Sequence, residues 1–204
     1  MIKPPFQTLA PIIPEIRSDP RNPCGDATRW CCLDDQSSEI EVLHFLRCLV
    51  VLLKPDVILE TGTHLGYGTA ALAQGCKDNQ AGHVWTVEHY APFLQRAFPL
   101  LQENGLLAWV DFISGDAREV KFDHQIDLLF IDGGTERNLE LSHFAPQLSP
   151  RGVILMHDAY LSHHYHYQEI PEVYTKIYLP CARGLWLLRP PYPLWPASPG
   201  NGNG

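Results

Sequence analysis

Five acidic residues end or follow apolar runs that are spaced along the chain like the strands of one sheet. They are Glu60, Glu88, Asp116, Asp132 and Asp158. Open α/β sheets bind their ligands beyond the carboxyl ends of the strands, so we expect these carboxylates to gather at one edge. Gathered carboxylates repel one another, which indicates a ligand that uses them. A phosphate-bearing dinucleotide matches so acidic an edge poorly, whereas a cationic ligand with a ribose diol and an adenine matches it well.

The first of these acids runs into a glycine-rich loop. The apolar residues 57–59 indicate a strand buried on both faces, and Gly62, Gly66 and Gly68 precede a helical run at 70–73. A strand, a glycine-rich turn and a helix form nucleotide pockets, because glycine lets the backbone approach a ligand. No Lys follows Gly68 as in a phosphate-binding loop, and the spacing does not match G-x-G-x-x-G. Taken alone, the loop is equally compatible with a tight turn that binds nothing.

The elements that position these residues alternate along the chain. Strands are expected at 56–60, 83–88, 108–113, 126–132 and 152–158, and helices at 67–75, 91–104, 134–148 and near 164–175. This alternation predicts a parallel sheet with helices on both faces. The runs 176–180 and 184–188, joined by a short Cys-Ala-Arg link, predict an antiparallel hairpin. The expected fold is α/β, with a Rossmann-like seven-stranded mixed sheet, helices on both faces and a C-terminal antiparallel hairpin.

One further helix is expected before the first strand. The residues S-E-I-E at 38–41 have the spacing of a capping box, and apolar residues then recur at helical intervals until Pro55 ends the helix. The preceding arm, 1–35, is irregular, and a substrate lid and a packing strap are equal alternatives for it. The tail, 191–204, is rich in Pro and Gly and is predicted to be disordered. One domain, 36–190, lies between them.

Composition excludes several classes of partner. The chain has 204 residues, 45% of them hydrophobic, which fits one domain with a full core. Its net charge is −8 and no basic stripe occurs, so neither nucleic acid nor a membrane surface is an expected partner. The longest apolar run, 48–53, is too short to cross a bilayer, and the first thirty residues lack a signal-peptide pattern. These features predict a cytoplasmic protein.

The six cysteines are accordingly expected to be reduced thiols. Cys24, Cys31 and Cys32 lie close together in sequence, but no second pair at zinc-site spacing accompanies them. A metal or redox role is therefore not expected there.

The motifs at the strand ends carry a resemblance to a known family. The segments E-T-G-T-H-L-G-Y-G-T, V-E-H, G-D-A, I-D-G-G and M-H-D occur in this order. Together they resemble the class I S-adenosylmethionine-dependent methyltransferases, and within them the small-molecule O-methyltransferases of the catechol and macrolide-sugar types. The similarity covers residues 36–190. Each motif is loose, but five in register make a fairly specific set.

This resemblance implies a site for S-adenosylmethionine. Glu60 and the backbone of Gly62 would hold the methionine moiety, and Glu88 would accept hydrogen bonds from both ribose hydroxyls. Asp116 would accept from the adenine amino group. A solvated helix-cap acid at Glu88 and an N-cap at Asp116 remain alternatives. The implied cofactor residues are Glu60, Gly62, Thr63, Gly66, Gly68, Glu88, Asp116, Ala117 and Asp132.

The resemblance also raises a metal site. Catechol-type relatives bind a divalent cation through acids after strands four and five and through the next residue. Asp132 and Asp158 occupy the two acid positions here, so Mg²⁺ or another divalent cation is a candidate cofactor. Ala159 stands at the third position and offers no ligand atom. Asp158 orienting the substrate without a metal is therefore the alternative.

Three residues are candidates for the chemical step. Asp132 would lie beside the transferring methyl group, His157 would be the general base for the acceptor hydroxyl, and Asp158 would bind metal or substrate. If the pleat continues, His157 and Asp158 point to opposite faces. A buried, hydrogen-bonded structural histidine is an equal alternative for His157.

Two histidine features differ from that pattern. The resembling enzymes often carry a His shortly after the I-D-G segment, but this chain has T-E-R at 135–137 and lacks a catalytic histidine there. The segment 163–167, with three His and two Tyr, is expected to be exposed and without chemistry. Acceptor binding and metal binding are its alternatives.

Taken together, the sequence predicts an enzyme that moves the methyl group of S-adenosylmethionine to a small acceptor, at a hydroxyl oxygen. A catalytically inactive binding or scaffold domain is the alternative, which Ala159 and the missing histidine favour slightly. An NAD-dependent oxidoreductase is disfavoured by the glycine spacing. A homo-oligomer is compatible with this prediction, and the sequence does not identify the acceptor.

Overall fold

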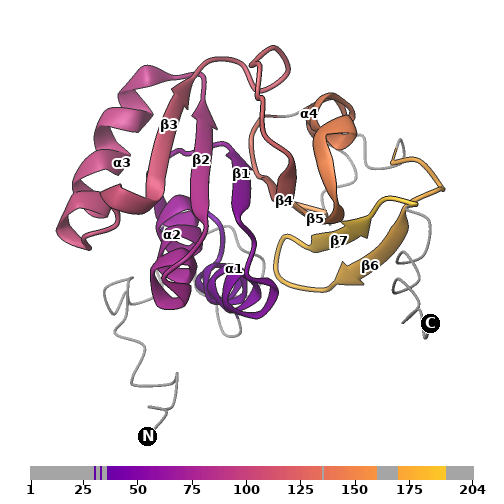
Figure 1. Ribbon diagram of the computed structural model, residues 1–204, viewed down its shortest axis with the longest axis horizontal. Coiled ribbons are helices and arrows are strands. Elements are labelled where there is room, and N and C mark those ends of the chain that lie inside the picture. The colour runs from indigo at the N-terminus through magenta and orange to yellow at the C-terminus, as the bar shows by residue number, and fades with distance from the viewer. Residues whose placement is uncertain (1–29, 31–32, 34–35, 135, 160–169, 192–204) are drawn as a thin grey trace, which may run out of the picture.

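The computed structural model describes residues 30, 33, 36–134, 136–159 and 170–191. In this part of the chain, seven strands form one sheet in the order β3-β2-β1-β4-β5-β7-β6 (Figure 1). The strands are β1 Val57–Thr61, β2 His83–Glu88, β3 Val110–Ser114, β4 Ile126–Ile131, β5 Leu148–His157, β6 Thr175–Leu179 and β7 Leu185–Arg189. The helices are α1 Ile40–Leu53, α2 Tyr67–Asn79, α3 Ala91–Glu103 and α4 Arg137–Phe144, with short 3-10 turns at Leu107–Trp109 and Ala145–Gln147.

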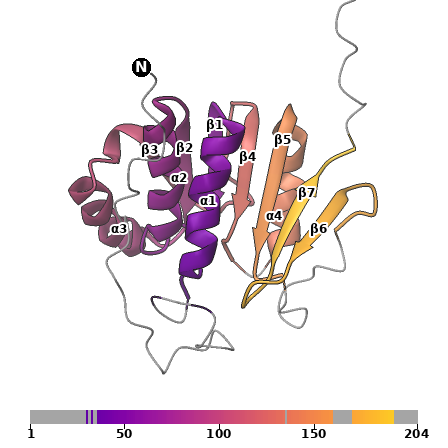
Figure 2. The same ribbon diagram turned by 90° about the horizontal axis from the view of Figure 1, so that it is seen from below.

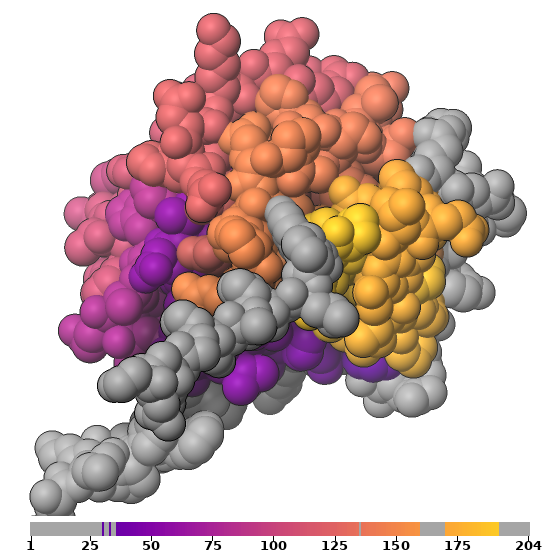
Figure 3. All heavy atoms as spheres, turned by 45° about the vertical axis from the view of Figure 1, so that its right-hand side comes forward, coloured from indigo at the N-terminus to yellow at the C-terminus, as the bar shows by residue number. Residues whose placement is uncertain are grey.

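The sheet is parallel on one side and antiparallel on the other. Strand β1 pairs in parallel with β2 and β4, β2 with β3, and β4 with β5. Strand β7 is antiparallel to both β5 and β6, and this hairpin forms the yellow flank of the molecule in Figure 3. The predicted seven-stranded mixed sheet with a C-terminal hairpin is therefore confirmed. Because β1 to β5 are parallel, their carboxyl ends lie along one edge.

Helices cover both faces of this sheet (Figure 2). Along β4, Leu128 and Phe130 belong to the core cluster that also holds buried residues of α1 and α2. Leu129 and Ile131 belong to the opposite cluster, with buried residues of α4. Successive side chains of a strand point to opposite faces, so a continuous apolar run such as 128–131 is what a sheet covered on both sides requires.

The start of α1 differs from the predicted capping box. Glu39 is the N-cap residue, and its side chain makes no capping hydrogen bond. The hydroxyl of Ser38 donates instead to Asp132 Oδ2 at 2.6 Å, and the carboxylate of Glu39 contacts His157 Nε2 at 2.6 Å. The capping-box prediction is wrong because the N-cap is Glu39, not Ser38, and the Ser38 hydroxyl has its partner elsewhere in the fold. These contacts join the start of α1 to the ends of β4 and β5.

Two predicted helices also differ from the structure. The helix expected at 134–148 is α4 at Arg137–Phe144, followed by a 3-10 turn that contains Pro146, and β5 already begins at Leu148. Proline lacks the N–H that an α-helix interior needs, which explains the early end. Of the helix expected near 164–175, residues 160–169 lie outside the described part, and residues 170–174 form bends and turns before β6.

Several predictions fall outside the described residues. They are the arm except for residues 30 and 33, the tail from residue 192, the cysteines at 24, 31 and 32, and the segment 163–167. The domain boundaries at 35 and 190 therefore stay predictions. None of the described helices is long and apolar enough to span a membrane.

Candidate active site

The loop between β1 and α2 is held close to its neighbours by glycines. Gly62 has φ +86° and Gly66 has φ +82°, which is the left-handed region that favours glycine. A Cβ on Gly62 would also clash with the backbone of Asp132, and one on Gly66 would clash with Ala97 of α3. The loop thus packs directly against the end of β4.

Glu60 is the buried carboxylate at the base of this loop. Its Oε2 accepts hydrogen bonds from the hydroxyls of Thr69 and Thr86, the second at 2.7 Å. Its Oε1 faces Gly68, where any Cβ would overlap it. Burial raises the pKa of Glu60 to about 8 although both hydroxyls oppose the shift. Within the described part of the chain, no residue forms an ion pair with the Glu60 carboxylate.

A pocket opens between this loop and the segment before α1. It brings together five of the predicted cofactor residues, Glu60, Gly62, Thr63, Gly68 and Asp132. The remaining wall is Gln36, Ser37, Ser38, His64, Leu65 and Tyr67. The other predicted site residues do not line it. They are Gly66, Glu88, Asp116, Ala117, His157 and Asp158.

Glu88, the last residue of β2, adjoins this pocket through the loop. Its Oε2 accepts from the backbone N–H of His64 at 3.0 Å, and its Oε1 accepts from that of Tyr90 at 2.8 Å. The largely exposed ring of His89 lies 3.3 Å from Oε1. A carboxylate offers about four acceptor positions, so Glu88 can accept further hydrogen bonds. At 5% exposure it is not the solvated acid of the alternative interpretation.

Asp116 lies two residues beyond β3, in a turn. Its carboxylate accepts from the backbone N–H of Arg118 at 2.9 Å and pairs with the guanidinium at 2.5 Å. Hydrogen bonds from Arg118 lower the pKa of Asp116 to about 2. The N-cap alternative is not supported, because Asp116 caps a turn and no helix follows before β4. Ala117 packs at the edge of the second core cluster.

The ends of β4 and β5 are joined by an arginine that sequence reasoning missed. Nη2 of Arg137 lies 3.1 Å from Asp132 Oδ1 and 2.7 Å from Asp158 Oδ2. The Arg137 side chain is only 4% exposed, and it also donates to the main-chain carbonyls of His157, Gly134 and Gly133. The two acids that were predicted to share a metal therefore share a guanidinium.

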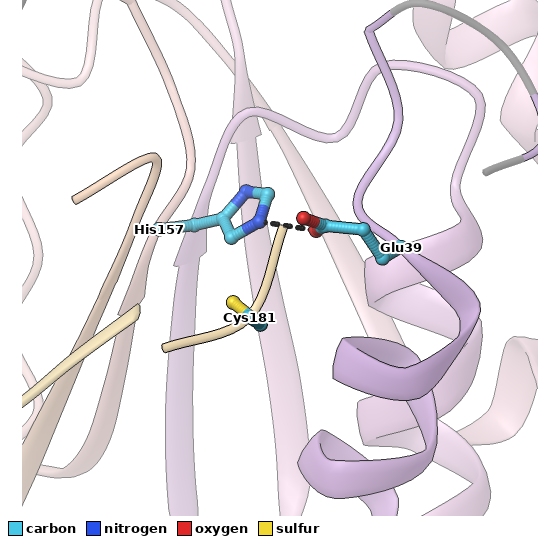
Figure 4. Close-up of side chains that lie close together, drawn as sticks. All are labelled: Glu39, His157 and Cys181. Carbon is cyan, nitrogen blue, oxygen red and sulfur yellow. Dashed lines mark hydrogen bonds and ion pairs between the residues drawn. The ribbon is translucent and has the colours of Figure 1, made fainter. Parts of the chain in front are cut away.

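His157 lies on the other side of Asp132 and is fully buried. Its Nδ1 is 3.0 Å from Asp132 Oδ1, and its Nε2 is 2.6 Å from Glu39 Oε2 (Figure 4). Burial alone would lower the pKa of His157, but Asp132 and Glu39 raise it to about 10. Burial would likewise raise the pKa of Asp132, but His157 and Arg137 lower it to about 2. Both ring nitrogens are engaged, which favours the structural alternative for His157 over a general base.

The backbone at Asp158 explains why its side chain lies near His157. Asp158 has φ +58°, so the pleat of β5 does not continue through it, and its Oδ1 is 3.6 Å from His157 Nδ1. The side chains of His157 and Asp158 were expected on opposite faces only if the pleat continued, and this condition is not met. Asp158 Oδ1 is buried and accepts no hydrogen bond within the described part of the chain, with Arg183 Nε 3.5 Å away.

Cys181, from the link between β6 and β7, approaches the same histidine (Figure 4). Glu39, His157 and Cys181 offer ligand atoms within 4.8 Å of one another. Burial raises the pKa of the Cys181 thiol to about 12. Glu39 is also occupied, since it accepts from the backbone N–H of Arg183 at 2.7 Å as well as contacting His157. This cluster does not fit a metal centre.

Two sets of carboxylates can now be distinguished at this edge. We call Glu60 and Glu88 the cofactor-side acids. We call the buried ionic group at the ends of β4 and β5 the charge network; its members are Glu39, Asp132, Asp158, Arg137, His157 and Arg183.

Sequence reasoning missed Ser38, Glu39, Arg137 and Arg183 as members of the site. The T-E-R segment at 135–137 was noted only because a histidine is absent there. The available signal was that this segment begins α4 close to the end of β4, so a long basic side chain at Arg137 can reach the neighbouring acids. No local signal pointed to Glu39, which lies 118 residues from its partner His157.

Comparison with known proteins agrees with the fold. A family model described as a methyltransferase domain matches residues 59–159. A catechol O-methyltransferase from Mycobacterium tuberculosis is 30% identical over 117 residues, which cover 56% of this chain and 52% of that protein. An O-methyltransferase from Aspergillus hancockii is 27% identical over 152 residues, which cover 68% of this chain and 60% of that protein. The chain thus spans between half and two thirds of the curated relatives that it matches.

Among solved structures, a methyltransferase from Podospora anserina bound to S-adenosylhomocysteine superposes with a TM-score of 0.67. It is 19% identical, and the match covers 76% of this chain and 80% of that one. At this identity the similarity is one of fold.

Proposed function

We propose that the chain is a class I S-adenosylmethionine-dependent methyltransferase and that it transfers the methyl group of this cofactor to a hydroxyl oxygen of a small acceptor. The observation that carries the proposal is the pocket on the β1–α2 loop, which is lined by Glu60, Gly62, Thr63, Gly68 and Asp132. The named O-methyltransferase relatives support the choice of oxygen.

The residues around this pocket fit the proposed cofactor. Glu60 is buried without a counter-ion among the described residues, which suits the ammonium group of a methionine moiety. Gly68 keeps the space in front of Glu60 Oε1 open, since a Cβ there would overlap that atom. Glu88 retains acceptor positions that suit two ribose hydroxyls. Asp116 is assigned to the adenine amino group and would share its carboxylate with Arg118.

The protein's contribution to the reaction is positioning and the handling of one proton. When bound, S-adenosylmethionine supplies an activated methyl group on a sulfonium. The chain must hold the acceptor oxygen in line with that group, which lowers the barrier by fixing orientation. Among the predicted catalytic residues, Asp132 lines the pocket and is assigned a place beside the methyl group.

For the proton we assign Asp158 in preference to His157. Both nitrogens of His157 are held by carboxylates, whereas Oδ1 of Asp158 is buried without a hydrogen-bond partner in the described part of the chain. A buried acceptor of this kind is costly unless a ligand group satisfies it, and an acceptor hydroxyl would do so. Asp158 would then orient the hydroxyl and draw its proton as the bond to carbon forms.

Calorimetric titration of the purified full chain with S-adenosylhomocysteine, using NAD as the control ligand, tests the cofactor assignment. We expect a dissociation constant near or below about 10 µM for the first ligand and no binding of the second. Binding of NAD alone, or of neither ligand, would contradict the proposal.

The transfer itself is tested by incubating the chain with S-adenosylmethionine and a panel of small hydroxylated aromatic acceptors. Mass spectrometry should detect a product one methylene unit heavier than the acceptor, together with S-adenosylhomocysteine. Cofactor binding without product from any acceptor in the panel would favour the inactive binding domain.

A further inference from the structure

We propose that the guanidinium of Arg137 takes the place of a divalent cation between Asp132 and Asp158, so that this methyltransferase site works without a metal. The inference rests on the proposed function for its meaning, but the contacts that support it are independent of the cofactor.

Three of the four carboxylate oxygens of Asp132 and Asp158 already have partners, and only Asp158 Oδ1 lacks a hydrogen bond in the described part of the chain. A hard divalent cation requires oxygen ligands at about 2.0–2.6 Å. Asp132 Oδ1 and Asp158 Oδ2 lie 3.1 and 2.7 Å from the same nitrogen, Nη2 of Arg137. The opposite oxygen of Asp132 accepts from the hydroxyl of Ser38 at 2.6 Å. A cation between the two acids would have to displace this nitrogen.

Arg137 cannot swing aside without breaking other contacts. Its guanidinium donates to the carbonyl of His157 at the end of β5 and to those of Gly133 and Gly134 after β4. Because the side chain is 4% exposed, its departure would leave these carbonyls buried and weakly satisfied. Arg137 therefore connects the segment after β4 to the end of β5, as a metal ion bound to both acids would do.

The charge in this region is also already balanced. The charge network contains three carboxylates, and the two arginines are always protonated. The group therefore carries one net negative charge if His157 is neutral and none if it is protonated, and in either case a divalent cation would leave it with a net positive charge. Buried charge without a partner is strongly unfavourable, so the residues present do not fit a divalent cation.

The sequence feature behind this arrangement is the T-E-R segment. Ala159 removes one metal ligand, and the same chain carries an arginine at 137, the first residue of α4. Arg137 donates to three main-chain carbonyls and contacts two carboxylates of the protein itself. We therefore assign it as a positioning residue that holds Asp158 for the acceptor.

Manganese binding tests this replacement directly. The full chain is stripped with EDTA and titrated with Mn²⁺, whose free form is counted by electron paramagnetic resonance. For the wild type we expect the same Mn²⁺ binding as for Asp158→Asn, because no cation occupies the paired acids. A wild-type Mn²⁺ site that disappears in Asp158→Asn would overturn the proposal, and this arm needs no change at residue 137.

Removing the arginine should create the metal site. Arg137→Ala should bind Mn²⁺ at least about tenfold more tightly than the wild type, since the guanidinium that lies between the two carboxylates would be gone. The gain should vanish in the double variant Arg137→Ala/Asp158→Asn. The matched control is Arg151→Ala, an exposed arginine near the start of β5, which should gain nothing. A folded Arg137→Ala that gains no Mn²⁺ site would overturn the role of Arg137.

Two further readouts separate this inference from the proposed function. Arg137→Lys keeps one positive charge but loses the planar guanidinium with its several N–H donors. The variant should therefore bind no Mn²⁺ and should unfold at a lower temperature than the wild type. A Mn²⁺ site in Arg137→Lys would contradict the proposal that a positive side chain takes the place of the metal. Binding of S-adenosylhomocysteine and methyl transfer by the wild type should be unchanged in EDTA. If S-adenosylhomocysteine does not bind in either condition, the proposed function fails while the Mn²⁺ results still decide the role of Arg137.

Discussion

The cofactor-side acids and the acids of the charge network lie at the same edge of the sheet but obtain their partners differently. Glu60 and Glu88 accept hydrogen bonds from hydroxyls and backbone N–H groups, and among the described basic side chains only the exposed ring of His89 lies within 4 Å of either carboxylate. In the charge network, every carboxylate lies within 4 Å of an arginine or histidine nitrogen. The first set has no arginine or lysine partner in the described part of the chain, whereas arginine and histidine side chains of the protein surround the second set.

This difference in partners shifts the pKa values of two buried carboxyl groups in opposite directions. Burial raises the pKa of Glu60 to about 8, whereas the neighbouring cations lower that of Asp132 to about 2 against the effect of burial. Both acids follow apolar strands and resemble each other in sequence. The difference teaches that an acid at a strand end marks a site but does not by itself say whether its ligand is a cation from outside or one from the chain.

Neutralising one acid of the charge network should give the largest effect. Glu39→Gln removes one of the buried counter-charges of His157 and Arg183, and breaking a buried ion pair costs about 3–5 kcal/mol. We expect the free energy of unfolding in urea to fall by about this amount. The matched control is Glu103→Gln at the exposed end of α3, which should change it by less than about 0.5 kcal/mol. Equal effects of the two substitutions would show that the network contributes nothing to stability.

Neutralising the cofactor-side acid Glu60 should instead increase the free energy of unfolding at pH 8. Because the folded pKa of Glu60 lies above the ordinary value of 4.5, its favourable contribution is present below pH 4.5 and is lost as the pH rises to about 8. This loss is about 1.4 kcal/mol per pH unit in that window. Glu60→Gln should remove that slope, so the unliganded variant should be more stable than the wild type at pH 8.

Urea unfolding of both proteins between pH 5 and pH 8 measures this effect as a difference in slope. His157, whose pKa is also raised, contributes a loss in the same direction above pH 6.5 in both proteins, and the difference cancels it. Parallel curves for Glu60→Gln and the wild type would contradict the unpaired state of Glu60.

If Glu88 binds the ribose hydroxyls, its removal should lower the affinity for S-adenosylhomocysteine. Glu88→Ala removes an acceptor of charged hydrogen bonds, each worth about 1.5–3 kcal/mol, so the affinity for S-adenosylhomocysteine should fall by that amount. Calorimetry on this variant and on Glu103→Ala, which should bind like the wild type, makes the measurement. Unchanged affinity in Glu88→Ala would remove the assignment.

Substituting the exposed Arg118 should have the smallest effect on stability, in contrast to substituting the buried Arg137. Arg118 pairs with Asp116 and Glu136 at the surface, and exposed ion pairs contribute little because water and salt screen them. The thermal unfolding midpoint of Arg118→Ala should equal that of the wild type, while that of Arg137→Ala should be lower by several degrees. A comparable drop in both variants would mean that burial is not what distinguishes the two arginines.

The sequence by itself determined the sheet and the positions of its acids. Apolar runs such as 57–59 and 128–131 can only be satisfied by a sheet that is covered on both faces, and parallel pairing then brings Glu60, Glu88 and Asp132 to one edge. The glycines of the β1–α2 loop were also visible in the sequence, because their spacing after a strand indicates a close approach of the backbone. These features depend on neighbours along the chain.

Only the tertiary structure decided the charge state and the partners of those acids. Glu39 meets His157 across 118 residues, Arg137 reaches Asp158 across the gap between two strands, and Ser38 leaves its local capping role for Asp132. Coulomb interactions and hydrogen bonds depend on distances in space and on burial, which no local pattern encodes. For that reason the acids could be located from the sequence, while the arginine between two of them could not.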